Sequence, residues 1–182
     1  LLTHQRDFDY VDDDAFIEAL TTGPGYLENK SGQRYYTLII PSADVISVSA
    51  WKKIEDFAAR GGKVLFWGRK PSCLVDKSFT SPQAIPDLPC CQYEPQVRWT
   101  ARVKAILPKP EMQLISSTND SIRYTRRVMP DGDLFFIFNE GSTSCNFIAD
   151  FDKVGIVKEW DATDGTIHPL DATVANNHTR LH

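Results

Sequence analysis

The sequence lacks any long apolar run. None of its segments approaches the roughly 20 consecutive apolar residues that a membrane-spanning helix needs. Residues 1–7 also lack the charged and apolar regions of a signal peptide, and the chain does not begin with methionine. We therefore expect no membrane partner, and we interpret the chain as a segment that begins inside a longer protein.

An excess of positive charge is absent as well. The 182 residues include 20 Lys and Arg against 24 Asp and Glu, which leaves a formal net charge of −4. A surface without a polybasic patch does not attract phosphate backbones, so we expect no nucleic-acid partner. The 42% of hydrophobic residues and 24% of charged residues are ordinary for a globular protein, and most of the chain should fold.

Motifs that would hold a metal ion are missing. The cysteines show no C-x-x-C spacing and no accompanying histidines, and the four histidines show no H-E-x-x-H pattern. The cysteines are Cys73, Cys90, Cys91 and Cys145. Five aspartates, Asp7, Asp9, Asp12, Asp13 and Asp14, could in principle bind a hard cation, but solvated charges at a helix start explain them more simply. We predict no metal site.

Signatures of nucleophilic catalysis and cofactor binding are absent too. No G-x-S-x-G elbow is present, and Gly23-Pro24-Gly25 lacks the strand and helix of a phosphate loop. Ser72 and Cys73 follow the cationic pair Arg69-Lys70, which leaves a degenerate hydrolase as one hypothesis. Pro71 disfavours a tight elbow there, so we predict no catalytic residue and no cofactor in this chain.

The first half carries the pattern of an α/β domain. Residues 36–40 and 63–68 are nearly continuous apolar runs, typical of parallel strands covered on both faces. Between them, apolar residues recur at helical spacing from residue 48 to 58, with Ser47 or Ser49 as a cap and Gly61-Gly62 as the stop. Residues 8–20 predict a strand end and a short helix. The result is a partial parallel-sheet domain, placed at residues 1–90.

The second half changes character after a proline-rich stretch. Residues 71–95 contain five prolines and predict a long surface connection without regular strands. Strand patterns then occupy residues 96–105, 121–128, 134–139, 155–160 and 166–170, with a hairpin turn at 130–133. Residues 176–182 suggest a frayed end or a cut. We therefore predict an all-β domain at residues 91–182, a partial antiparallel β-sandwich whose open edges would favour association.

Candidate ligand contacts follow from side-chain chemistry alone. Exposed aromatic rings beside planar hydrogen-bonding groups suit sugars, and the strands offer several such residues, although core packing explains aromatic residues in strands equally well. A second possible location is the crevice at the carboxyl ends of the two parallel strands, near residues 41–43 and 68–71. The candidates are Arg69, Trp99, Arg126, Arg127, Asn139, Trp160 and Asp161.

Three N-x-S/T sequons, at Asn29, Asn119 and Asn177, would permit glycosylation and slightly favour a secreted protein.

Three stretches, in order, resemble a known family. They are residues 7–16 (DFDYVDDDAF), residues 35–71 (YYTLIIPSADVISVSAWKKIEDFAARGGKVLFWGRKP), and residues 122–170, with YTRRVMPDGDLFFIFNEGS and KEWDATDGTIHPL. Together they resemble α-L-rhamnosidase-type glycoside hydrolases of family 106 and their relatives. The resemblance implies a catalytic (β/α)₈ barrel upstream, followed by an amidotransferase-like or flavodoxin-like α/β domain and then by β-sandwich domains. It also implies that the catalytic carboxylates lie on the barrel, outside this chain.

The sequence therefore predicts a non-catalytic accessory segment of a secreted or extracellular glycoside hydrolase that acts on plant or microbial polysaccharide. Its partners would be the catalytic barrel of the same protein and, through that enzyme, a carbohydrate substrate. The alternative is a free-standing α/β module that binds a carbohydrate or another small molecule.

Overall fold

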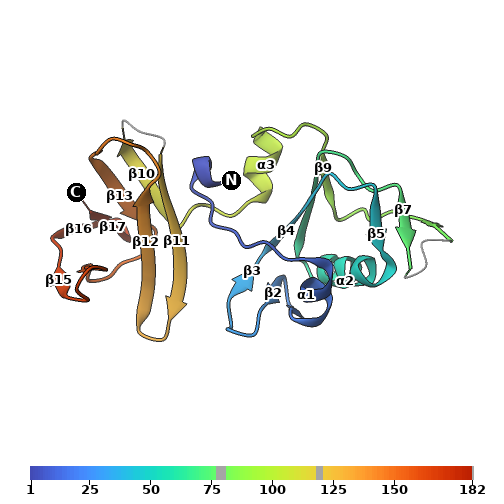
Figure 1. Ribbon diagram of the computed structural model, residues 1–182, viewed down its shortest axis with the longest axis horizontal. Coiled ribbons are helices and arrows are strands. Elements are labelled where there is room, and N and C mark those ends of the chain that lie inside the picture. Colours follow the sequence, from blue (N-terminus) through green and yellow to red (C-terminus); the bar gives the residue numbers. More distant parts are fainter. Residues whose placement is uncertain (77–80, 118–120, 182) are drawn as a thin grey trace. The chain divides into compact units, whose positions relative to one another are not determined.

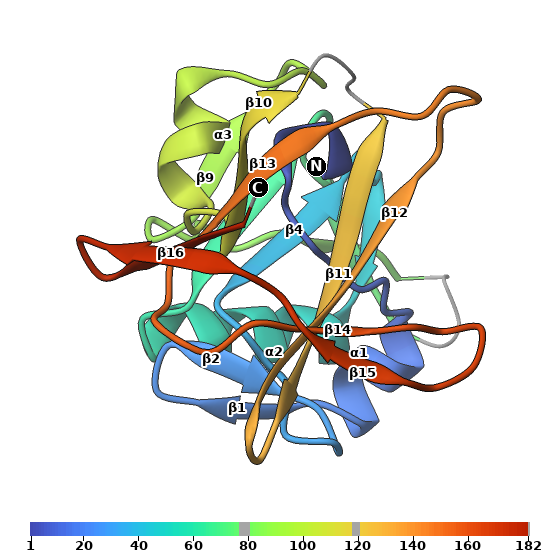
Figure 2. The same cartoon turned by 90° about the vertical axis from the view of Figure 1, so that its left-hand side faces the viewer.

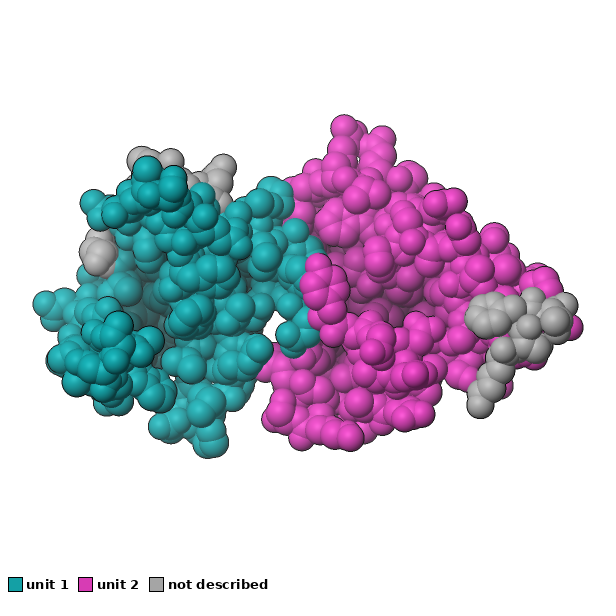
Figure 3. Space-filling view, in the orientation of Figure 1, with its two compact units in different colours: residues 1–9, 109–182 teal, residues 10–108 magenta. Residues whose placement is uncertain are grey.

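A computed structural model (Figure 1) describes residues 1–76, 81–117 and 121–181. The chain forms two compact units, coloured separately in Figure 3. The α/β unit is Tyr10–Pro108, and the β unit combines Leu1–Asp9 with Lys109–His182. These bounds differ from the predicted division at residues 90 and 91, because a strand and a helix beyond residue 91 complete the α/β unit.

The α/β unit contains three small sheets. A parallel sheet has the order β4-β6-β9, a second sheet has the order β5-β7-β8 with β5 and β7 parallel, and β1-β2-β3 is antiparallel. The elements are α1 (Asp13–Glu18), β1 (Thr21–Gly23), β2 (Tyr26–Glu28), β3 (Arg34–Tyr35), β4 (Thr37–Pro41), β5 (Val45–Ser47), α2 (Val48–Ala59), β6 (Lys63–Trp67), β7 (Cys73–Val75), β8 (Gln83–Ala84), β9 (Gln92–Glu94) and α3 (Ala101–Ile106).

Helix α2 forms where the sequence predicts it. The Ser47 side chain accepts a hydrogen bond from the Ala50 amide and caps the first turn, while Gly61 adopts the positive φ of 88° that ends the helix. The apolar face of α2 is buried, and Trp51 stacks on Phe66 of β6. The predicted β4, α2 and β6 unit is thereby confirmed, with β4 and β6 parallel.

Two predictions for the middle of the chain are wrong. The proline-rich stretch 71–95 contains β7, β8 and β9, and β9 is the third strand of the parallel sheet. Five residues lie between Pro89 and Pro95, and the last three of them form β9, so the prolines flank the strand and do not interrupt it. Residues 96–105 include α3 instead of a strand, because the Thr100 hydroxyl accepts a hydrogen bond from the Val103 amide and caps a helix.

The β unit contains a four-stranded antiparallel sheet of order β10-β13-β17-β16 and two separate hairpins, β11-β12 and β14-β15. Figure 2, in which the left-hand side of Figure 1 faces the viewer, labels β10 to β16 of this unit. Its elements are the 3-10 helix η1 (Leu2–His4), β10 (Met112–Ser117), β11 (Ile122–Met129), β12 (Gly132–Asn139), β13 (Phe147–Phe151), β14 (Lys158–Trp160), β15 (Ile167–Pro169), β16 (Ala172–Ala175) and β17 (His178–Leu181).

One small core joins the β11-β12 hairpin to the four-stranded sheet. Tyr124 of β11 packs against Phe135 of β12, and Phe135 meets Phe151 of β13 edge to face at 4.9 Å between ring centres. Met112 and Ala149 complete the buried centre. The predicted hairpin at residues 130–133 is confirmed, since Met129 pairs with Gly132 across a two-residue turn.

The last residues form regular structure, so the predicted frayed end is wrong. Strands β16 and β17 pair across a turn in which Asn176 and Asn177 have φ values of 53° and 64°. Two consecutive asparagines at positive φ are typical of a type I′ hairpin turn. Strand β17 then pairs with β13 on its other side, which places it inside the sheet.

The first nine residues bind the edges of the β unit. The side-chain oxygen of Gln5 accepts a hydrogen bond from the Leu114 amide of β10. The main-chain carbonyl oxygen of Gln5 accepts one from the Tyr124 hydroxyl. One oxygen of Asp7 accepts a hydrogen bond from the Arg126 amide of β11. The segment therefore satisfies edge donors on two strands, although the sequence assigned it to the α/β domain.

Candidate functional site

Arg126 lies in an ionic cluster within the β unit. Its guanidinium donates two hydrogen bonds to one oxygen of Asp133, at 2.9 and 2.7 Å, and pairs with Glu111. Lys153 pairs with the other oxygen of Asp133. The side chains of Arg126 and Asp133 are only 13% and 12% exposed. This guanidinium is occupied by carboxylates of its own unit, which favours a structural role over ligand binding.

The charges of this cluster support one another. Burial alone would raise the pKa of Asp133, but hydrogen bonds from Lys153 and Arg126 outweigh it and hold that pKa below its ordinary value. Burial likewise disfavours the Arg126 cation, and its bonds to Asp133 and Glu111 raise its pKa overall. The cluster links β11, β12 and the residues beside β10 and β13 through ion pairs.

Arg127 and Asn139 also bind main-chain groups near them. Arg127 is exposed and donates to the carbonyl oxygen of Arg126 at 2.9 Å. The Asn139 amide donates to the Thr143 carbonyl oxygen, and its side-chain oxygen accepts from the Gly141 amide, both at 2.8 Å. Asn139 thus shapes the turn that follows β12.

Trp160 and Asp161 mark the end of β14. The Trp160 side chain is largely exposed, whereas one oxygen of Asp161 accepts hydrogen bonds from the hydroxyl and the amide of Thr163. The Thr163 hydroxyl, followed by its amide, lowers the pKa of Asp161. Asp161 therefore stabilises the β14-β15 turn, and Trp160 is the residue of the pair with a free apolar surface.

Arg69 lies in the α/β unit, at the carboxyl end of β6. It forms an exposed ion pair with Asp44 at 3.0 Å, and its amide donates to the Ser42 hydroxyl at 2.9 Å. Gly68 has a φ of 99°, and a β-carbon there would lie 2.1 Å from the Ser42 hydroxyl oxygen. The Ser72 hydroxyl donates to the Asp44 carbonyl oxygen. Contacts within the chain thus occupy much of the predicted crevice.

Sequence reasoning missed Glu94, the buried carboxylate at the carboxyl end of β9. Its two oxygens accept hydrogen bonds from the Thr100 hydroxyl at 2.7 Å and the Gln96 amide at 3.1 Å. The Thr100 bond, then the Gln96 bond, lowers the pKa of Glu94. Pro95, which follows Glu94, was the available sequence signal for an extended residue at a strand end, because a residue before proline is held in an extended conformation.

The predicted candidates do not converge. Among the described residues, no hydrogen bond or ion pair joins Arg126, Asn139 and Trp160 to one another. Trp99 is half-buried in the α/β unit, which also contains Arg69. The other candidates lie in the β unit. The Asn119 sequon lies outside the described residues, whereas Asn177 is exposed in the β16-β17 turn.

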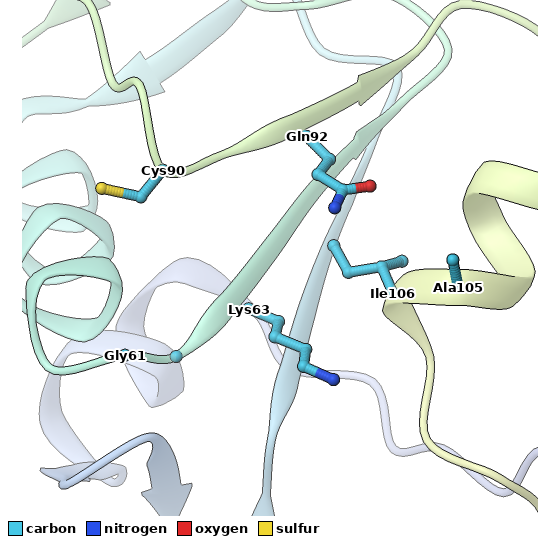
Figure 4. A pocket seen from close by; sticks show the side chains of 7 residues that line it. Gly61, Lys63, Cys90, Gln92, Ala105 and Ile106 are labelled. Atoms are coloured by element: carbon cyan, nitrogen blue, oxygen red, sulfur yellow. The ribbon is translucent and has the colours of Figure 1, made fainter.

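One pocket of about 270 Å³ opens in the α/β unit (Figure 4). It lies at the amino end of β6, opposite the predicted crevice, and no carboxylate contributes to its wall. Its volume is slightly below the range of small-molecule sites. The lining residues are Gly61, Gly62, Lys63, Cys90, Gln92, Ala105 and Ile106. The pocket supplies an amine, a thiol and an amide but no acid and base pair for hydrolysis of a glycosidic bond.

The described cysteines are all free thiols. Cys91 packs against the core of the α/β unit, and burial, with a smaller contribution from Cys90, raises its pKa to about 12. Its neighbour Cys90 is exposed. Within the described part of the chain, no group of three or more His, Cys, Asp and Glu residues is arranged to hold a metal ion. No helix of the described residues is long and apolar enough to cross a membrane.

The model of the alpha-L-rhamnosidase family, glycoside hydrolase family 106, matches residues 2–174. The chain belongs to this family. The resemblance found in the sequence is therefore confirmed over nearly the whole chain.

Among solved structures, the chain is similar to a rhamnosidase from Novosphingobium sp. PP1Y, with a TM-score of 0.67 and 15% sequence identity. The match covers 95% of this chain and 18% of that rhamnosidase. The chain therefore spans less than a fifth of the length of its structural neighbour. At this identity the likeness concerns the fold, a mixture of parallel and antiparallel sheets with few helices. A search of curated proteins found no match.

Proposed function

We propose that this chain is a non-catalytic accessory segment of a larger α-L-rhamnosidase. The observation that carries the proposal is the combination of a family match over residues 2–174 with coverage of only 18% of the similar rhamnosidase. Its amidotransferase-like and sandwich-like parts would support a catalytic barrel that other residues of the complete enzyme form. The substrate of that enzyme would be a rhamnose-containing carbohydrate of plant or microbial origin.

The chemistry of the described residues supports a non-catalytic role. Hydrolysis of a glycosidic bond ordinarily needs two carboxyl groups facing one substrate, one as acid and one as base or nucleophile. Two carboxylates with little exposure, Asp133 and Glu94, accept hydrogen bonds from neighbours that hold them ionised, and the pocket wall contains no carboxylate. A carboxylate held ionised in this way is a poor proton donor at neutral pH.

Activity measurements test the proposal directly. The 182-residue chain and the complete polypeptide from the same gene are assayed with an aryl α-L-rhamnoside. We expect turnover by the complete polypeptide and none above background by the chain. Hydrolysis by the chain alone, retained in Cys73→Ala but lost in Ser72→Ala, would overturn the proposal in favour of a degenerate hydrolase.

The second candidate function is a sugar-binding α/β module. The exposed Arg69 and Asp44 pair at the carboxyl end of β6 favours it, because both side chains can also bond sugar hydroxyls. It predicts saturable stabilisation of the chain by L-rhamnose that Arg69→Ala removes. We expect no such stabilisation.

We also propose a secreted or extracellular location for the parent enzyme, supported by the sequon at Asn177 on an exposed turn. Expression in a glycosylating host followed by mass spectrometry tests this location, and we expect a glycan at Asn177 that Asn177→Gln removes.

A further inference from the structure

The β14-β15 hairpin has one apolar face. Lys158 pairs with Pro169, and Trp160 pairs with Ile167. Directly paired residues lie on the same face of a hairpin, and alternate residues along a strand share that face. Lys158, Trp160, Ile167 and Pro169 therefore form the apolar face, on which the stem of Lys158 extends the contact area.

Nothing among the described residues covers this face. All six strand residues are exposed, with Trp160 at 60% and Ile167 at 59%. Ile156, just before β14, is 89% exposed. Among the strands of the described residues, β14 and β15 pair only with each other. A lone two-stranded hairpin is only marginally stable in water, and here Trp160, at the end of β14, shares an exposed apolar face with Ile167.

The turn of the hairpin is nevertheless well ordered by its own bonds. Asp161 accepts hydrogen bonds from Thr163, and Asp164 accepts them from the amide and hydroxyl of Thr166. Gly165 supplies the positive φ of 78° that the turn needs. These bonds order the turn that joins Trp160 to Ile167. An aromatic side chain presented in a pre-ordered segment is typical of a binding anchor, because less conformational entropy is lost on association.

We propose that the apolar face formed by Lys158, Trp160, Ile167 and Pro169 docks on an apolar surface of another domain of the complete α-L-rhamnosidase. This inference rests on the proposed function and adds the surface through which the segment attaches. The occupant follows from size: the structural neighbour is more than five times as long as the matched region, so most of that protein is available to cover such a face. The one basic residue of the face predicts an acidic group at the rim of the partner surface.

Hydrogen exchange tests the proposal in the complete polypeptide and in the 182-residue chain. We expect the amides of β14 and β15 to exchange at least about tenfold more slowly in the complete polypeptide, because docking suppresses local opening. Trp160→Ser should remove this difference. Glu159→Ser is the matched control, since Glu159 is the adjacent residue on the opposite face, and it should retain the difference. Circular dichroism of both variants checks that they fold.

Equal exchange in the two proteins, with no effect of Trp160→Ser, would overturn the docking proposal. Slower exchange on raising the concentration of the 182-residue chain would replace it with self-association, and slower exchange on adding L-rhamnose would replace it with a sugar site.

These results are distinguishable from failure of the proposed function. An active complete polypeptide with an unprotected hairpin contradicts only the docking inference. A gene without a further domain, or hydrolysis by the 182-residue chain, contradicts the accessory role itself.

Discussion

The two units of this chain bury their apolar residues to different extents. In the α/β unit, α2 and β6 contribute a continuous core in which Trp51, Phe57 and Phe66 are almost completely buried. The β unit has a smaller buried centre of Met112, Tyr124 and Ala149. It leaves Phe136, Trp160 and other large apolar side chains exposed. Units of similar length can therefore differ in how much of their apolar surface their own folding covers.

The β unit also contains partly buried ion pairs. Its cluster of Arg126, Asp133, Glu111 and Lys153 connects strands that share few fully buried side chains. The α/β unit instead has exposed ion pairs, such as Arg60 with Asp56, which contribute little to stability. We therefore expect the α/β unit to respond most strongly to loss of volume and the β unit to respond most strongly to loss of charge.

The largest expected effect is in the core of the α/β unit. Phe57 is completely buried, and Phe57→Ala should lower the free energy of unfolding of that unit by about 4 kcal/mol through lost burial and a cavity. Urea unfolding, monitored through the hydrogen exchange of the β6 amides, measures this loss of unfolding free energy. Phe136→Ala on the exposed face of β12 is the matched control, and it should change the stability of the β unit by less than about 0.5 kcal/mol. Equal losses would remove the contrast between the units.

Loss of charge in the β unit comes next. Asp133→Asn leaves Arg126 and Lys153 without a shared carboxylate and should destabilise that unit by about 3 kcal/mol. Urea unfolding, monitored through hydrogen exchange of β11 amides, measures the loss. Asp131→Asn, in the adjacent exposed turn, is the control and should have little effect.

The same cluster predicts a pH dependence. The folded-state pKa of Asp133 lies below its ordinary value, so its contribution is fully present above an unfolded pKa of about 3.9 and is lost as the pH falls through the folded pKa. Unfolding midpoints measured between neutral pH and pH 3 should therefore decrease in the acid range for the unmodified chain. Asp133→Asn should show a shallower decrease, and an unchanged slope would contradict the assigned role.

A smaller effect is expected for the N-terminal segment. Asp7→Ala removes the acceptor of the Arg126 amide and should destabilise the β unit by about 1.5 kcal/mol. Thermal unfolding measures the loss. Asp7→Asn keeps a side-chain oxygen in place and should recover most of it. Destabilisation of the α/β unit instead would show that residues 1–9 belong with that unit, as the sequence suggested.

Thiol labelling should distinguish Cys90 from Cys91 by the rates at which they react. The exposed Cys90 should react readily at pH 8, whereas Cys91, with a pKa of about 12, has only about 1 in 10,000 of its thiols ionised there. Cys91 should therefore be labelled only when the α/β unit opens, and Phe57→Ala should accelerate that reaction. Mass spectrometry of the Cys90→Ser variant measures it, and rapid labelling of Cys91 in the folded chain would contradict the burial.

Local patterns predicted the parts of the fold that are stabilised locally. The 48–58 periodicity with its serine cap predicts α2, and the apolar runs on either side predict β4 and β6. The Pro130-Asp131 turn predicts the pairing of β11 with β12. The candidate ligand residues were recognised only as chemical types. Their assignment could not follow from sequence, because whether Arg126 meets a sugar or Asp133 depends on strand pairing.

Patterns along the chain were enough to predict the α2 helix, the two strands beside it, the β11-β12 hairpin and the resemblance to the α-L-rhamnosidase family. These features depend on residues close together in the chain or on the order of three recognisable segments. The folded structure was needed to show that residues 1–9 bind the β unit, that β17 lies between β13 and β16, and that Trp160 is largely exposed. Neighbouring strands and buried positions depend on contacts between residues far apart in the chain, and a short strand carries no local signal for such contacts.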